Sequence, residues 1–150
     1  MLALRSTSKE TTLAMINFVG GGPLVLVVED VEETRDGIEA LLKVDGYRVN
    51  AARDERDAVR KARRETPNLV LLSLAGRNVD LVAAALRIRR RVGLSQNVPI
   101  VIFSVESVPE GTEMEMGKNV WVTSPDNFDQ LRRLLRRLLH RPRFAPGVSS

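Results

Sequence analysis

Acidic and hydroxyl side chains stand directly after several short apolar runs of this sequence, where they could take part in chemistry. Glu29 and Asp30 follow the first run, and Ser73 and Ser104 close two later runs. Adjacent carboxylates repel each other and lose solvation, so such a pair often binds a hard cation such as magnesium. The alternative is a surface pair at the start of the next helix, where the helix dipole favours negative charge. From these residues alone, the surface pair is the simpler interpretation.

The acidic residues after the first run argue against an enzyme that binds a nucleotide or a flavin. Dinucleotide-binding folds place a glycine-rich, anion-binding turn at this point. Residues 29–33 instead read Glu-Asp-Val-Glu-Glu and would repel a pyrophosphate. The glycines of residues 20–22 precede the run and lack the lysine and hydroxyl residue of a P-loop. A small flavodoxin-like nucleotide or flavin enzyme is therefore disfavoured.

Ser73 lacks the neighbours that would turn its hydroxyl into a nucleophile. A serine attacks only when an adjacent base accepts its proton. His140 is the only histidine and ends the last predicted helix, while an ordinary carboxylate is a weak base at neutral pH. The sequence has no cysteine, which excludes disulfides and thiolate chemistry. We therefore predict no catalytic residue and expect that the chain is not an enzyme.

Alternating strand and helix patterns position these side chains. Runs rich in leucine and β-branched residues predict five strands, at residues 24–29, 47–52, 68–73, 99–104 and 120–123. Helical spacing of apolar residues predicts helices at about 32–45, 54–65, 80–92, 109–116 and 127–140. Asp54 is predicted to cap the second helix, and Gly46 to end the first. Such repeats imply an α/β fold, a (βα)5 doubly wound parallel sheet whose ligands bind at the carboxyl ends of the strands.

Length and composition fit one domain between two flanking segments. The chain has 150 residues, of which 43% are hydrophobic and 28% charged. Residues 1–23 end in Gly-Gly-Gly-Pro and are interpreted as a flexible arm, 24–140 as the domain and 141–150 as a tail. Because only this tail follows the domain, we expect a stand-alone module. No apolar run approaches the roughly 20 residues that span a bilayer, so we expect a cytoplasmic protein without a membrane partner.

Residues 24–139 resemble a response-regulator receiver domain of two-component signalling. Residues 25–30 read VLVVED, like the first strand and acidic pair of that family. Residues 67–74 read PNLVLLSL and resemble its third strand, and residues 98–104 and 121–125 resemble its fourth and fifth strands. The resemblance implies a flavodoxin-like topology with strand order 2-1-3-4-5.

The resemblance also implies a phosphorylation site from which two residues are missing. Family receivers use an acidic pair after the first strand and an aspartate after the third strand, which accepts the phosphoryl group. Glu29 and Asp30 match the pair, but Ser73 occupies the acceptor position. The family lysine that pairs with the phosphoryl group falls on Ser124. The site thus lacks both the nucleophile and the cation, and a degenerate pseudo-receiver is predicted.

Two switch positions of the family are filled, by Ser104 and Trp121. Magnesium is disfavoured, because two carboxylates remain where the family has three and Mg²⁺ requires nearly octahedral ligation. Glu29 and Asp30 are therefore weak magnesium candidates, and we expect no metal and no other cofactor. Arg77 could pair with one of these acids, or could be a solvated loop arginine.

The last predicted helix carries a stripe of positive charge. Residues 127–150 contain six arginines and one acid. With a period of 3.6 residues, the leucines of this helix fall on one face and four arginines on the other. This arginine stripe consists of Arg132, Arg133, Arg136 and Arg137. With few aromatic residues and no recognition helix, nucleic acid is disfavoured as a partner.

In receivers, the fourth helix, fifth strand and fifth helix form the usual interaction face. The matching segments here are the acidic helix expected at 109–116, the strand at 120–123 and the helix that carries the stripe. This implies a protein partner or a homodimer. The predicted function is phosphorylation-independent protein–protein interaction in a two-component or phosphorelay context. The alternative is an active response regulator with a substitute phosphoacceptor, Ser73 or a nearby acid.

Overall fold

The computed structural model describes residues 22–103, 113–115, 117–123 and 128–140. The elements in chain order are β1 (Leu24–Val28), α2 (Glu32–Val44), β2 (Arg48–Ala52), α3 (Glu55–Arg64), β3 (Leu69–Leu72), α4 (Asn78–Val92), β4 (Ile100–Phe103), β5 (Glu113–Glu115), β6 (Val120–Thr123) and α5 (Phe128–Leu139). Nearly all of the predicted arm and the whole predicted tail lie outside the described residues. No described helix has the length and apolar character needed to cross a membrane.

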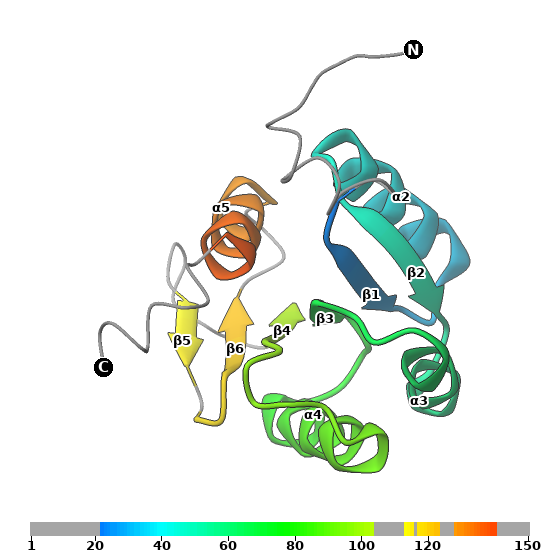
Figure 1. The fold of residues 1–150 in the computed structure, drawn as a ribbon, viewed down its shortest axis with the longest axis vertical. Coiled ribbons are helices and arrows are strands. Elements are labelled where there is room, and N and C mark those ends of the chain that lie inside the picture. The colour runs from blue at the N-terminus through cyan, green and yellow to red at the C-terminus, as the bar shows by residue number, and fades with distance from the viewer. Residues whose placement is uncertain (1–21, 104–112, 116, 124–127, 141–150) are drawn as a thin grey trace.

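The strands form one sheet in the order β2-β1-β3-β4-β6-β5. The first five strands of this order run parallel, which confirms the predicted order 2-1-3-4-5 and the doubly wound fold. In Figure 1, α2 and α5 cover one face of the sheet, and α3 and α4 cover the other. The carboxyl ends of β1, β3, β4 and β6 therefore lie along one edge.

The strand at the end of this order, β5, corrects one prediction. A helix was expected at 109–116, but residues 113–115 form β5, antiparallel to β6. The turn between them has positive φ at Gly117, Lys118 and Asn119, the left-handed backbone that returns a chain into a hairpin. A short acidic segment is a marginal helix, so pairing with the edge of the sheet prevails over helical spacing.

Side chains alternate between the two faces along each central strand, as strand geometry requires. One core, which includes Leu26, Leu72 and Ile102, packs against α3 and α4. The other includes Val27, Leu71 and Val101, and packs against α2 and α5. All residues of β1, β3 and β4 are buried, as expected for parallel strands covered on both faces.

Both predicted helix boundaries are confirmed. The Asp54 carboxylate accepts a hydrogen bond of 2.8 Å from the backbone N–H of Asp57, and so caps α3. Gly46 follows the end of α2 with φ +95°, a backbone conformation that glycine adopts without steric cost.

A buried arginine holds the loops at the amino edge of the sheet. Arg89 of α4 is only 7% exposed. Its guanidinium donates to the carbonyl oxygens of Ser95, Val98 and Lys118 at 2.7, 2.9 and 2.8 Å. Burial lowers the pKa of Arg89 from its usual value. This side chain thereby joins α4, the loop before β4 and the β5–β6 turn.

Candidate functional site

The carboxyl ends of β1 and β3 bring Glu29 and Ser73 together. The two strands are neighbours in the sheet, with Val28 opposite Leu72. The backbone N–H of Ser73 donates to the carbonyl oxygen of Val28 at 2.7 Å, which continues the strand pairing by one residue. Beyond that bond, the Ser73 hydroxyl donates to Glu29 Oε1, also at 2.7 Å. The sheet therefore fixes this contact between residues that lie 44 positions apart in the chain.

Glu29 is a buried carboxylate, and each of its two oxygens accepts a hydrogen bond. The residue is 5% exposed. Its Oε1 accepts from Ser73, and its Oε2 accepts from the backbone N–H of Val31 at 2.9 Å. Its carbonyl oxygen accepts from Arg35 Nη1 at 2.8 Å. Charge-assisted hydrogen bonds of this kind offset the cost of burying a carboxylate.

The two adjacent acids of the sequence differ in their exposure. Asp30 is exposed, whereas Glu29 is buried. Arg77 is also exposed and ends its loop as the residue before α4. Among the described residues, no ion pair joins Arg77 to either acid, which agrees with the solvated loop arginine.

The described donors do not fit a magnesium site. Mg²⁺ requires near-ideal octahedral oxygen ligation, in proteins commonly supplied in part by carboxylates. Within the described ranges, no three or more His, Cys, Asp or Glu side chains are grouped so that they could hold a metal ion. Both oxygens of Glu29 already accept hydrogen bonds, and Ser73 offers it a donor where a carboxylate would be a further ligand.

Of the remaining site positions, the structure describes one. Ser104 and Ser124 lie outside the described residues. Trp121 is half-buried in β6, and its indole N–H donates to Asn119 Oδ1 at 2.8 Å. The Arg137 guanidinium lies 5.9 Å from the centre of the Trp121 ring, within the range of a cation–π contact. Trp121 is thus held between the β5–β6 turn and α5.

The arginine stripe on α5 is divided between internal and exposed side chains. Arg132 forms a two-point contact with Asp45, with Nε–Oδ2 and Nη2–Oδ1 distances of 2.8 and 2.6 Å. The hydrogen bond from Arg132 is the main cause that lowers the pKa of Asp45. Arg133 and Arg136 are exposed. The acidic side chains expected opposite the stripe, in residues 110–115, lie outside the described side chains.

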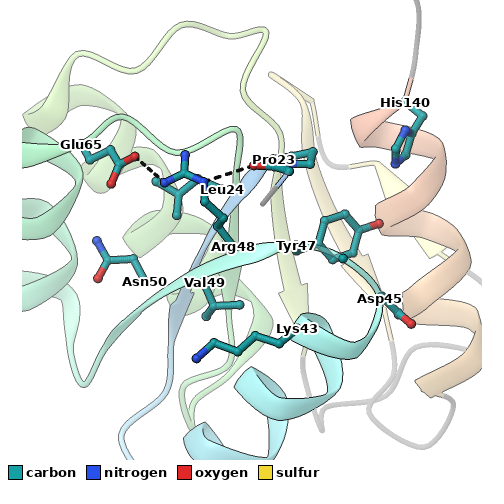
Figure 2. A pocket seen from close by; sticks show the side chains of 12 residues that line it. Pro23, Leu24, Lys43, Asp45, Tyr47, Arg48, Val49, Asn50, Glu65 and His140 are labelled. Carbon is teal, nitrogen blue, oxygen red and sulfur yellow. Dashed lines mark hydrogen bonds and ion pairs between the residues drawn. The ribbon is translucent and has the colours of Figure 1, made fainter. Parts of the chain in front are cut away.

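A hollow of about 890 Å³ lies at the opposite, amino edge of the sheet (Figure 2). Sequence reasoning missed it, because its walls come from chain segments that are distant in sequence. Two of its charged groups pair with each other, Arg48 with Glu65 at 2.8 Å, and Arg48 also donates to the carbonyl oxygen of Gly22 at 3.2 Å. Tyr47 is buried beside it, and this burial raises the pKa of the phenol. The hollow lies at the edge of the sheet opposite Glu29, and neither Glu29 nor Ser73 is among its lining residues.

Comparisons with known proteins agree with this geometry. Residues 25–136 match the response regulator receiver domain family. Transcriptional regulatory protein CseB of Streptomyces coelicolor is 30% identical over 124 residues, which cover 77% of this chain and 50% of CseB. The probable transcriptional regulator ycf27 of Porphyridium aerugineum is 29% identical over 119 residues, 78% of this chain and 48% of that protein. The chain thus spans about half the length of the curated relatives it matches.

Solved structures share the fold. The receiver domain of a Pseudomonas aeruginosa PAO1 sensor histidine kinase, with magnesium coordinated in its active-site cleft, has a TM-score of 0.61 and 26% identity. The match covers 80% of this chain and 99% of that one. A chain from the complex of histidine kinase ThkA with response regulator TrrA has a TM-score of 0.60 and 24% identity, covering 78% and 98%.

Proposed function

Because this chain belongs to the response regulator receiver domain family, we propose that it is a receiver that signals by binding a protein partner without accepting a phosphoryl group. In this proposal the receiver fold is kept as a scaffold, and the phosphorylation site is replaced by the hydrogen bond between Ser73 and Glu29. No enzymatic step and no metal ion are then needed for its action.

The observation that carries the proposal is the hydrogen bond from Ser73 to Glu29. Where the family has an aspartate that would repel Glu29, this chain has a hydroxyl that donates to it at 2.7 Å. A hydrogen bond to a charged group stabilises by about 1.5–3 kcal/mol, whereas close like charges destabilise. The buried carboxylate is therefore satisfied within the protein, without a cation or a phosphoryl group.

The same contact also supports a second candidate function. A hydroxyl at 2.7 Å from a carboxylate oxygen has the geometry of a nucleophile beside a base. Ser73 could then be a substitute phosphoacceptor, with Glu29 accepting its proton. This candidate is weaker, because transfer brings negative charge that a cation must balance. No lysine or arginine forms an ion pair with Glu29 or Asp30 in the part of the chain that the structure describes.

A protein partner is proposed on the face of β6 and α5. The response regulator in the ThkA complex binds a histidine kinase, and a kinase or another acidic protein is the partner we propose here. Arg133 and Arg136 are exposed and project from α5. Exposed charges of one sign steer association and fix specificity more than they add affinity. A second copy of the chain is the alternative partner.

Trp121 gives a direct test, since it is the only tryptophan and lies on the proposed face. We expect its fluorescence to stay unchanged when beryllofluoride, a phosphoryl analogue, is titrated together with magnesium. A saturable change that requires both reagents would contradict the proposal. If Ser73→Ala abolished that change, the second candidate function would replace the first.

A further inference from the structure

Five arginines line one hollow on the face of the sheet opposite α5. We call it the arginine hollow; its lining consists of Arg56, Arg60, Arg63, Arg64 and Arg91 around the buried Val59. Its volume is about 550 Å³. The first four arginines have the spacing i, i+4, i+7 and i+8, which places them on one face of α3. Arg91 comes from the last turn of α4, so the charges of two helices converge on one place.

Most of these guanidinium groups have no internal counterion. Arg56, Arg64 and Arg91 form no side-chain hydrogen bond or ion pair within the described residues. Arg63 donates to a backbone oxygen, the carbonyl of Arg91, at 2.9 Å. Arg60 alone of the five forms an ion pair, with Asp57, among the described residues.

Two acids of α3, Asp57 and Glu55, form ion pairs with basic side chains. Asp57 is 7% exposed, and its Oδ2 also lies 3.6 Å from Lys61 Nζ. Glu55 accepts two hydrogen bonds from Arg87 of α4, at 2.9 and 2.8 Å. Arg87 is the main cause that lowers the pKa of Glu55. Asp57 balances Arg60, and Arg91 contributes to the lowered pKa of Glu55. Because these two carboxylates also interact with Lys61 and Arg87, they do not neutralise all five arginines, and the arginine hollow carries a positive excess.

Helix dipoles account for only part of this charge. Arg63, Arg64 and Arg91 stand in the last turns of their helices, where the dipole favours cations. Arg56 stands in the first turn of α3, where the dipole disfavours a cation. Its position beside the other guanidiniums is explained if all of them face a common anion.

We propose that the arginine hollow binds a compact anion with two or more phosphate groups, such as a diphosphate or triphosphate moiety. Guanidinium groups bind phosphate oxygens with two parallel hydrogen bonds each. The volume lies in the range of about 300–1,000 Å³ that small-ligand sites have. Convergence on one hollow fits a compact ligand better than a nucleic acid, whose phosphates recur along an extended backbone. The inference is independent of the function proposed for the Glu29 edge.

Calorimetric titration of the full chain at about 0.15 M salt tests the proposal with pyrophosphate and tripolyphosphate as probes. We expect saturable binding that strengthens from orthophosphate to pyrophosphate, and a melting temperature that rises with probe concentration. Sulfate at equal ionic strength should not reproduce either effect. Absence of saturable pyrophosphate binding would overturn the proposal.

Two double variants of equal net charge separate the site from general charge. Arg64→Gln with Arg91→Gln should weaken pyrophosphate binding by about tenfold or more, because it removes two charged contacts. Arg53→Gln with Arg90→Gln removes two exposed arginines outside the hollow and should leave binding unchanged. If the first pair fails to fold, Arg56→Gln alone serves in its place.

Equal weakening in both double variants would overturn the proposal, since the effect would then be general electrostatics. Binding of duplex DNA or of a polyglutamate chain through Arg64 and Arg91, without pyrophosphate binding, would also overturn it. Such a result would assign the arginine hollow to a macromolecular partner.

Discussion

The substitution Ser73→Asp reverses the feature that distinguishes this site. Ser73 donates a hydrogen bond of 2.7 Å to Glu29, which is only 5% exposed. An ionised aspartate cannot donate that bond, and it places a second negative charge beside the buried one. We therefore expect the variant to fold but to be less stable than the native chain.

The magnitude follows from two contributions to the free energy of unfolding. Loss of a hydrogen bond to a charged group costs about 1.5–3 kcal/mol. Repulsion between unit charges at about 4 Å is about 4 kcal/mol at an effective dielectric constant of about 20. Residue 73 is only half-buried, so an aspartate can turn toward solvent and escape most of this repulsion. The expected net loss is about 2–3 kcal/mol.

Urea denaturation at pH 7 measures this loss, and Ser73→Asn is the matched control. Asparagine has the shape of aspartate but carries no charge and can donate to Glu29, so it should be more stable than the aspartate variant. Magnesium should raise the stability of Ser73→Asp alone, because a third carboxylate completes a set of oxygen ligands. If Ser73→Asp were as stable as Ser73→Asn without magnesium, that result would contradict the expected repulsion between an aspartate at position 73 and Glu29.

Three further predictions concern the surface and the framework. Arg133→Glu with Arg136→Glu should leave the melting temperature nearly unchanged but weaken partner capture or self-association. Added salt should weaken the binding of the native chain in the same way. Binding that is unaffected by the two substitutions and by salt would place the interaction surface elsewhere. Asp45→Asn should lower the melting temperature at pH 7. Because Arg132 holds the pKa of Asp45 below its usual value, the stabilisation exists above the unfolded pKa and is lost as pH falls through the folded pKa. The difference between the native chain and Asp45→Asn should therefore vanish in acid, and a difference independent of pH would contradict the pair. Arg89→Ala should cost about 2–4 kcal/mol of unfolding free energy in urea, since it leaves buried carbonyl oxygens without donors; a loss below about 0.5 kcal/mol would show that these bonds contribute little.

The parallel sheet could be predicted because short apolar runs alternate along the sequence with segments of helical spacing. The meeting of Glu29 with Ser73 followed from that sheet, since both end neighbouring strands. The hydrogen bond between them could not be predicted, because its direction depends on which side chain is buried. That Asp30 is exposed while Glu29 is buried could not be predicted for the same reason.

Other features could not be predicted from the sequence, because they involve segments that are distant in the chain or elements too short to show a pattern. Asp45 and Arg132 are 87 residues apart, and no local pattern links the end of α2 to α5. A strand of three residues such as β5 has too few side chains to show a period of two. The spacing of the arginines on α3 is visible in the sequence, but only packing against α4 shows that they share a hollow with Arg91.

The most direct test of the central claim is the intact mass of the protein after incubation with acetyl phosphate and magnesium. We expect an unchanged mass, because Ser73 is neutral and its hydroxyl donates its hydrogen bond to Glu29. A stable gain of one phosphoryl group, abolished by Ser73→Ala, would contradict it and show an active receiver with a serine acceptor.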